Sequence, residues 1–425
     1  MPGPKGEGQD ARNNLMMDKI SDMTTSDLDS NNAKQLKVDV VVFGGGVAGL
    51  WLLARLLQEG YNALLLENNS LGAGQTRFSQ GIIHGGTKYA LTGKLTASSE
   101  SIFAMPQIWR DCLQGKGEVD LSSAMVLSEH QYMWSTPGLL SRLSGFFASR
   151  VVRGRMLAVK KNDYPAVFKN KKFKGKVYRL DEPVVDAGSI IKALAKPNMN
   201  HIMHIKSMTD FSENQFNVEI PDGEVWNITV EKIILSAGKG NAALLKQMGR
   251  TIPEMQLRPL QMVMVRGGLP EKLYAHCLGA SVNPRITITS SEDKQGNIVW
   301  YLGGQLAEEG IHRTAEEQIR KAKKELQSLM PWLNFSAMQW ATLNISRAEQ
   351  KQKEGQRPST SFYYEENNVI TTWPTKLALA PNLANDVLKQ LEKQTVTKSG
   401  VTEMPEFSHA SVADLPWQEE EKWQR

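Results

Sequence analysis

A strand, a glycine-rich turn, a helix and a second strand follow one another within residues 37–67, and this succession constrains the fold more than any other part of the chain. Residues 38–43 form a β-branched and aromatic run, which is typical of a strand buried on both faces. The turn that follows reads GGGVAG, and leucines then recur at helical spacing until Gly60. Residues 63–66 are apolar again. The stretch therefore predicts a strand–turn–helix–strand unit of an α/β fold.

Each glycine of this turn suits a nucleotide-binding role. Gly44 permits the tight turn after the strand, Gly46 leaves space for the backbone to approach a pyrophosphate, and Gly49 lets the helix pack close to the sheet. Val47 and Ala48 lie at the start of the helix, where N–H groups and partial positive charge face a phosphate. The turn therefore predicts a dinucleotide site.

The second strand ends at an acidic residue, Glu67, with Asn68 beside it. An acid about 20 residues beyond the first glycine is placed to accept hydrogen bonds from an adenosine ribose. Because an acid rather than an arginine stands here, a 2′-phosphate is disfavoured, and NADP with it. FAD and NAD both remain open on this pattern alone.

Composition limits the remaining possibilities. The 425 residues are 41% hydrophobic and 22% charged, which fits one or two ordinary globular domains. Cys112 and Cys277 are far apart and favour a reducing compartment. No apolar run approaches the roughly 18 residues of a membrane span. Residues 1–36 are polar and lack the apolar core of a signal peptide, so we expect a disordered leader and a cytoplasmic protein.

A second glycine-rich stretch follows at residues 71–89 and reads LGAGQTRFSQGIIHGGTKY. This wording resembles the FAD-dependent oxidoreductases of the D-amino-acid oxidase superfamily, and locally it is most similar to FAD-dependent glycerol-3-phosphate dehydrogenase and L-2-hydroxyglutarate oxidase. The resemblance implies FAD rather than NAD, with a loop that passes under the flavin. The loop residues implied to contact FAD are Gln75, Thr76, Ser79, Gln80 and Gly81.

Two later stretches carry the same resemblance. Residues 230–238 resemble a second FAD-contacting strand that ends at Ala237 and Gly238. Residues 355–381 resemble the terminal segment of the FAD domain, whose loop contains Lys376 and Leu377 and closes over the flavin. The family usually has glycines at the start of that loop, whereas this chain has Trp-Pro at 373–374.

The resemblance spans residues 37–393 and implies a two-lobed α/β (α+β) protein. We expect a Rossmann-like FAD-binding domain, discontinuous in sequence, at 37–95, 178–250 and 340–395. A mixed-sheet substrate domain is expected at 96–177 and 251–339, and a flexible tail at 396–425. Alternating or apolar runs predict strands near 119–130, 206–230, 256–266, 285–289 and 298–302, while helical spacing predicts helices near 95–109, 187–195, 242–248 and 315–330.

His84 is the sharpest candidate for a catalytic group, because the resemblance places its loop beside the isoalloxazine ring. An imidazole titrates near neutral pH, so it can accept a proton as a C–OH or C–NH group is oxidised. The alternative is a histidine that only packs or hydrogen-bonds under the flavin.

Arg357 precedes a proline where amino-acid-oxidising relatives hold the substrate carboxylate, and a guanidinium fork fits a carboxylate in a bidentate way. Arg347 and Arg77 are alternatives for the same task. Among the other histidines only His201 and His204 have ligand-like spacing, and no carboxylate accompanies them, so we expect no metal site.

A basic region follows an amphipathic segment at residues 139–151. Arginines and lysines cluster at 150–176 with a single opposing acid, Asp163. The favoured interpretation is a helix packed on the substrate domain beside a solvated basic loop. Residues 139–176 also suit peripheral contact with an anionic membrane, on its inner face, where a quinone would accept electrons. Nucleic acid is the less favoured partner of the cluster.

Together these features predict an FAD-dependent oxidoreductase that removes a hydride from a CH–OH or CH–NH₂ carbon of a small anionic metabolite. The substrate classes left open are 2-hydroxy acids, amino acids and polyol phosphates, and the electron acceptor is oxygen or quinone. The alternatives are a flavoprotein that acts on a nucleic-acid-borne amine and an inactive FAD-bound scaffold.

Overall fold

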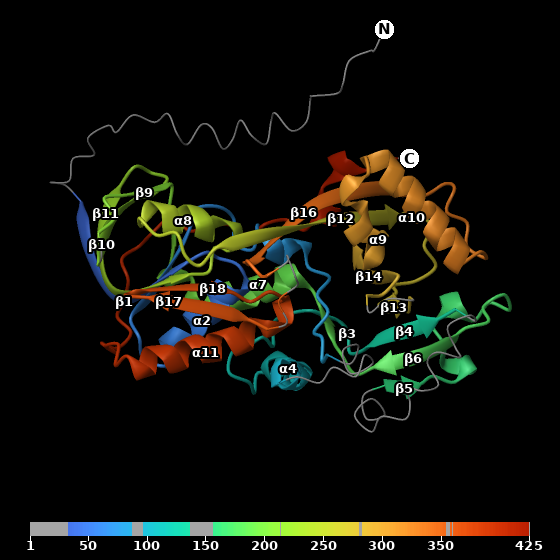
Figure 1. The fold of residues 1–425 in the computed structure, drawn as a ribbon, viewed down its shortest axis with the longest axis horizontal. Helices are drawn as coiled ribbons and strands as arrows, with labels where there is room; N and C mark the ends of the chain where they lie inside the picture. Colours follow the sequence, from blue (N-terminus) through green and yellow to red (C-terminus); the bar gives the residue numbers. More distant parts are fainter. Residues whose placement is uncertain are drawn as a thin grey trace, which may run out of the picture.

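The computed structural model describes residues 33–86, 97–136, 156–212, 214–279, 283–353, 358 and 360–424. Within these ranges two eight-stranded sheets organise the chain, and a short two-stranded sheet pairs β3 (Val126–Ser128) with β7 (Val184–Val185). The two large sheets occupy the two halves of the molecule (Figure 1). The predicted two-lobed α/β architecture is confirmed.

The first sheet is built on the predicted strand–turn–helix–strand unit. β1 (Lys34–Phe43) pairs in parallel with β2 (Ala63–Glu67) on one side and with β11 (Val225–Leu235) on the other. The strand order is β17-β18-β11-β1-β2-β8, with β10 and β9 added beside β11. The remaining strands are β8 (Ile202–His204), β9 (Ser207–Thr209), β10 (Gln215–Glu219), β17 (Phe362–Glu366) and β18 (Val369–Trp373). Because β1, β2, β11 and β18 run parallel, their carboxyl ends meet at one edge of the sheet.

Helices cover one face of this sheet and form its main core. Leu50, Trp51 and Leu53 of α2 (Val47–Gln58) are fully buried there, and burying one such side chain contributes about 1.5–3 kcal/mol. The other helices of this layer are α4 (Ala97–Leu113), α7 (Ala187–Ala195) and α11 (Ala380–Lys393). The opposite face packs against α8 (Asn241–Gln247) and against part of the C-terminal tail.

The second sheet has the order β16-β12-β15-β14-β13-β4-β6-β5. Its strands are β4 (Gln131–Ser135), β5 (Met156–Ala158), β6 (Lys176–Leu180), β12 (Met255–Arg266), β13 (Ala275–Cys277), β14 (Ile286–Glu292), β15 (Ile298–Gly303) and β16 (Gln339–Gln350). The long β12 and β16 extend from the first half of the molecule toward α10 (Ala315–Leu329) (Figure 1). A reciprocal cap between Thr314 and Glu317 starts α10, whose apolar side packs on this sheet.

The predicted helices and strands within the described residues are confirmed, except that the strand expected near 119–130 is limited to β3 at 126–128. Two elements lie in the other half of the molecule from the one we expected. α4 packs in the core of the first sheet, although residues 96–177 were assigned to the substrate domain. β16 pairs along its whole length with β12 of the second sheet, although residues 340–395 were assigned to the FAD-binding domain. A hydrophobic pattern predicts whether a segment is a helix or a strand. It does not predict which half of the molecule the segment joins, because the elements that α4 and β16 pack against are remote in sequence.

The C-terminal tail, expected to be flexible, instead crosses both halves of the molecule. We call residues 396–424 the C-terminal strap. Phe407 packs on the first sheet, Val412 bridges to Leu71, and Gln424 exchanges two backbone hydrogen bonds of 2.7 Å with Trp340 of β16. The polar composition of the strap hides a few apolar anchors whose partners lie far away in the sequence.

Candidate functional site

Glycines bring three backbone segments into close contact at the carboxyl edge of the first sheet. Gly44 has a φ of +107°, and a Cβ atom on it would lie 2.6 Å from the Cα of Ala237. A Cβ atom on Gly49 would lie 1.9 Å from the carbonyl oxygen of Gly44. Real Cβ contacts are longer than 3.0 Å, so the strand, the turn and α2 adopt this arrangement only with glycine at both positions.

The start of α2 offers the space and the donors that a pyrophosphate needs. Gly46 is the N-cap residue and has no side chain of its own with which to cap the helix. A Cβ atom on Gly46 would meet a single described atom within 4 Å, the hydroxyl oxygen of Thr76 at 3.3 Å. That hydroxyl accepts the Val47 N–H at 3.1 Å, and Ala48 follows in the first turn. The cradle fits the phosphates of a dinucleotide.

Glu67 ends β2 beside this turn, as predicted. One of its oxygens accepts the Gly45 N–H at 2.6 Å, and the other accepts the Asn69 N–H at 2.9 Å. Burial raises the pKa of Glu67, and the backbone donors, including that of Asn68, oppose the rise. Each carboxylate oxygen has a further lone pair, so Glu67 can also accept a ribose hydroxyl.

The predicted flavin loop links the two sheets. Gln75 starts the short helix η2 (Gln75–Phe78), and its side-chain oxygen accepts the Ala348 N–H of β16 at 2.5 Å. The Gln80 side chain donates to the Tyr301 carbonyl of β15 at 3.1 Å. Gly81 has a φ of +67°, and a Cβ atom there would lie 2.0 Å from the Val185 carbonyl oxygen. The loop residues, Ser79 included, therefore lie between the first sheet and the second.

The predicted closing loop lies next to the end of β11. The Trp373 indole donates to the Gly238 carbonyl at 3.0 Å. Trp373, which stands where the family usually has a glycine, therefore joins the closing loop to the end of β11. Thr375 has a φ of +62°, and the Lys376 N–H donates to the Pro374 carbonyl at 2.7 Å. A β-branched residue is strained in this conformation, and such strain gathers at functional sites. Leu377 continues into the short helix η11 (Leu377–Leu379).

His84 lies on the segment that leaves the flavin loop, and a buried carboxylate stands behind it. Its Nδ1 atom is 3.7 Å from Oε2 of Glu182, whose side chain is 5% exposed. Burial alone would raise the pKa of Glu182, but the neighbouring His84 imidazole, the Gly85 N–H and the charge of His276 hold that pKa at about 2. Glu182 is therefore ionised at every pH at which the protein would work.

Residues from the second sheet complete this cluster. The ring of His276 on β13 stacks with that of His84, with centroids 5.9 Å apart and an interplanar angle of 17°. The His276 Nδ1 atom pairs with the Thr287 hydroxyl at 2.8 Å, and the Gln131 amide donates to Glu182. Sequence reasoning missed Gln131, Glu182 and His276 because they are 47 or more residues from His84 along the chain. The only local feature that could have pointed to this cluster is the position of Glu182 directly before Pro183.

The candidates for anion binding have different positions. Arg357 lies outside the described residues, so its role stays a prediction. Arg77 forms an ion pair with Glu419 of the C-terminal strap, which favours a structural role. Arg347 is half-buried on β16, in register with Arg258 of β12.

The basic region is described only in part, since residues 137–155 are outside the described ranges. Seven lysines between 156 and 176 are exposed, at positions 160, 161, 169, 171, 172, 174 and 176. No helix in the described parts of the chain has the length and apolar character to cross a bilayer. Nor do the described residues group three or more His, Cys, Asp or Glu side chains as a metal site would need.

Comparison with known proteins agrees with a flavin site. The family model described as FAD dependent oxidoreductase (DAO) matches residues 39–354. Over 385 residues the chain is 44% identical to the probable FAD-dependent oxidoreductase PA4991 of Pseudomonas aeruginosa, an alignment that covers 90% of this chain and 98% of that protein. The crystal structure of PA4991 superposes with a TM-score of 0.78 and 39% identity over 90% of this chain and 98% of that one.

More distant structures share the fold. Glycine oxidase from Geobacillus kaustophilus has a TM-score of 0.58 and 13% identity over 84% of this chain and 95% of its own. L-α-glycerophosphate oxidase from Mycoplasma pneumoniae, solved with FAD bound, has a TM-score of 0.60 and 15% identity over 90% of this chain and 100% of its own. The chain belongs to the DAO family of FAD-dependent oxidoreductases, and FAD is its cofactor.

Proposed function

We propose that this enzyme removes a hydride from a CH–OH or CH–NH₂ carbon of a small anionic metabolite, and that His84 takes the accompanying proton. The position of His84 carries the proposal. The imidazole follows a loop that links the flavin edge to the second sheet, and a buried carboxylate holds its other side. This is the point at which a substrate resting on the second sheet would meet the cofactor.

The division of labour follows from the residues present. FAD, when bound, supplies the hydride acceptor. The cradle of Gly46 and Val47 and the Glu67 carboxylate would hold its pyrophosphate and ribose. His84 removes the proton from the substrate oxygen or nitrogen, and together with loss of the hydride from carbon this leaves a carbonyl compound or an imine that water hydrolyses.

The anionic character of the substrate is inferred from two observations. Glycine oxidase and L-α-glycerophosphate oxidase share this fold, and by name their substrates carry a carboxylate or a phosphate beside an amine or an alcohol. This chain offers cations for such a group at Arg357, which we propose as the clamp, and at the half-buried Arg347 as the second choice. A guanidinium binds either anion with two parallel hydrogen bonds.

The test is anaerobic bleaching of the flavin by 2-hydroxy acids, amino acids and polyol phosphates. His84→Ala should retain FAD but slow reduction by about 10²–10⁴-fold. Arg357→Lys keeps the charge but loses the fork, so it should mainly raise the substrate concentration for half-saturation, by roughly ten- to a hundredfold. If no anionic donor bleaches the flavin while neutral alcohols or amines do, the proposed substrate class is wrong. Reoxidation by air or by a soluble quinone then identifies the acceptor.

A further inference from the structure

A short antiparallel contact fixes the segment that carries His84. The Ile83 N–H donates to the Pro183 carbonyl at 2.9 Å, and the Val185 N–H donates to the Gly81 carbonyl at 2.9 Å. Ile82 and Val184 form a bridge between these two contacts. The backbone immediately before His84 and immediately after Glu182 is therefore held in one register, which brings the two residues close together.

The Glu182 carboxylate is fixed as well. Its Oε1 atom accepts the Gly85 N–H at 2.8 Å, and its Oε2 atom accepts the Gln131 side-chain amide. The residue is 4% exposed. A buried carboxylate that receives a backbone donor and a side-chain donor has a single well-defined orientation.

The His84 ring presents one particular nitrogen to this carboxylate. Nδ1 is the atom that lies 3.7 Å from Oε2 of Glu182, and the His276 ring stacks against the imidazole. At 3.7 Å this contact is longer than a hydrogen bond, and catalytic contacts are often long before substrate binds and tighten afterwards. The nitrogen that faces a carboxylate carries the proton, which leaves the other nitrogen with its lone pair.

We propose that Glu182 is a positioning residue that holds His84 as the Nδ1–H tautomer, so that Nε2 accepts the proton of the substrate. The proposal rests on the role of His84 proposed above. The substrate O–H or N–H bond breaks and its proton forms a bond with Nε2, while bound FAD would accept the hydride, with its two electrons, that leaves the substrate carbon. The Glu182 carboxylate then stabilises the resulting imidazolium.

The charges around the pair agree with this role. His84 and the Gly85 N–H lie on one side of Glu182, and His276 approaches from β13. Burial would raise the pKa of Glu182, yet these groups keep it at about 2, so a negative charge stands behind His84 throughout the working range. His276 is buried and pairs with Thr287, whereas the His84 side chain is 22% exposed. Of the two imidazoles, His84 is therefore the one that a substrate can reach more easily.

The tautomer can be measured without a substrate. In FAD-loaded enzyme labelled with ¹⁵N-histidine, the His84 resonances are identified by their loss in His84→Ala. We expect wild-type His84 to be the Nδ1–H tautomer above its titration range, and Glu182→Gln to convert it wholly or partly to the Nε2–H tautomer. A wild-type Nε2–H tautomer, or an unchanged tautomer in Glu182→Gln, would overturn the proposal. The wild-type measurement decides even if the variant does not fold.

Kinetics provide the second readout. Glu182→Gln should bind FAD normally and slow flavin reduction by about 10²–10⁴-fold, with little change in half-saturation and with an altered pH profile. Glu182→Asp keeps the charge and should recover part of the rate. Glu365→Gln, which also removes the charge of a largely buried carboxylate but lies on the edge strand β17 of the first sheet, is the matched control and should leave the reduction rate unchanged. A normal rate and pH profile in Glu182→Gln would refute the positioning role. Absence of bleaching by any donor in wild type would instead refute the proposed function, while the tautomer still decides the role of Glu182.

Discussion

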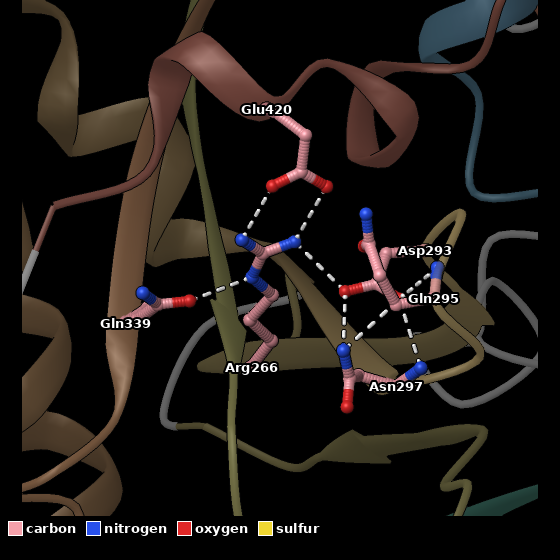
Figure 2. Close-up of polar contacts among 6 residues, drawn as sticks. All are labelled: Arg266, Asp293, Gln295, Asn297, Gln339 and Glu420. Carbon is pink, nitrogen blue, oxygen red and sulfur yellow. Dashed lines mark hydrogen bonds and ion pairs between the residues drawn. The ribbon is translucent and has the colours of Figure 1, made fainter.

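Replacing Arg266 with methionine should loosen the C-terminal strap from the second sheet. Figure 2 shows the guanidinium at the centre of a cluster of polar contacts. It donates to both oxygens of Glu420 at 2.7 and 3.0 Å, to Asp293 at 2.8 Å and to Gln339 at 2.9 Å. The ring of Trp423 covers it, with the guanidinium carbon 4.3 Å from the ring centroid. Two strap residues therefore depend on this one cation.

The size of the stability loss depends on which other interactions Asp293 and Glu420 retain when Arg266 is removed. Removing one member of a buried ion pair costs about 3–5 kcal/mol, because the other charge remains buried. Here Asp293 still accepts from the backbone of Gln295 and Asn297, and the Glu420 side chain is 44% exposed and can be hydrated. Methionine also replaces the apolar stem of the arginine. We therefore expect the free energy of unfolding to fall by about 2–3 kcal/mol.

The pH dependence should change in a defined direction. Burial would raise the pKa of Asp293, but hydrogen bonds from Asn297, Gln295 and Arg266 lower it below its usual 3.8. A lowered folded-state pKa contributes stability that is present above the usual pKa and is lost as the pH falls through the folded value. Arg266→Met removes one cause of that lowering, so its deficit should be largest near neutral pH and smaller near pH 3.

Urea denaturation at pH 7 and pH 3 measures this change through the midpoint at constant slope. The matched control is Arg285→Met, because Arg285 also pairs with a glutamate, Glu325, but is 35% exposed. Because this pair is partly exposed through Arg285 and has a single carboxylate partner, it should contribute less than the Arg266 cluster, about 1 kcal/mol. If Arg266→Met is no less stable than Arg285→Met, the cluster does not hold the strap as argued. Faster trypsin cleavage after Lys422 in Arg266→Met would show directly that the strap has come loose.

Three further outcomes are expected. Gly49→Ala should lower the free energy of unfolding by about 1–3 kcal/mol and weaken FAD binding. The control Gly188→Ala should be neutral or slightly stabilising, because its new Cβ atom makes only ordinary 3.4 Å contacts. Equal urea midpoints for the two variants would contradict this. Glu182, with a pKa of about 2 against the usual 4.5, should contribute about 3 kcal/mol above pH 4.5 that is lost as the pH falls toward 2, so Glu182→Gln should flatten the stability curve in that window. If residues 139–176 contact an anionic membrane, the enzyme should co-sediment with phosphatidylserine vesicles, and charge reversal at Lys171 and Lys172 should weaken this by about 1 kcal/mol per lysine; no co-sedimentation of the wild type would exclude that contact.

The flavin edge was predictable from sequence because its determinants are local. Gly44, Gly46 and Gly49 lie within six residues of one another, and the strand and helix around them have clear periodicities. The close contacts at Gly44 and Gly49 require what the pattern suggested. The strands β12, β14 and β15 and the helices α7 and α10 were found for the same reason.

What the sequence did not predict depends on pairs that are remote along the chain. Glu182 reaches the loop of His84 through a backbone contact between residues 81–83 and 183–185. β16 joins the second sheet because it pairs with β12. The hydrophobic pattern of neither strand predicts which strand it pairs with. The sequence of the strap predicts a flexible tail because its anchoring partners, Arg266 and Trp340, are remote from it along the chain. Single-sequence patterns describe the elements but not their choice of neighbours.

These long-range contacts share one consequence for the chemistry. Hydride transfer requires the substrate carbon and the flavin to be held a few ångströms apart, and here one is expected on the second sheet and the other on the edge of the first. Gln75 joins the flavin loop to β16, Gln80 joins it to β15, and the strap crosses both sheets. Among the described contacts, these three ties therefore help to set the distance between donor and acceptor. A single loosened tie should change the rate by altering this distance, even where every residue that touches the substrate is intact.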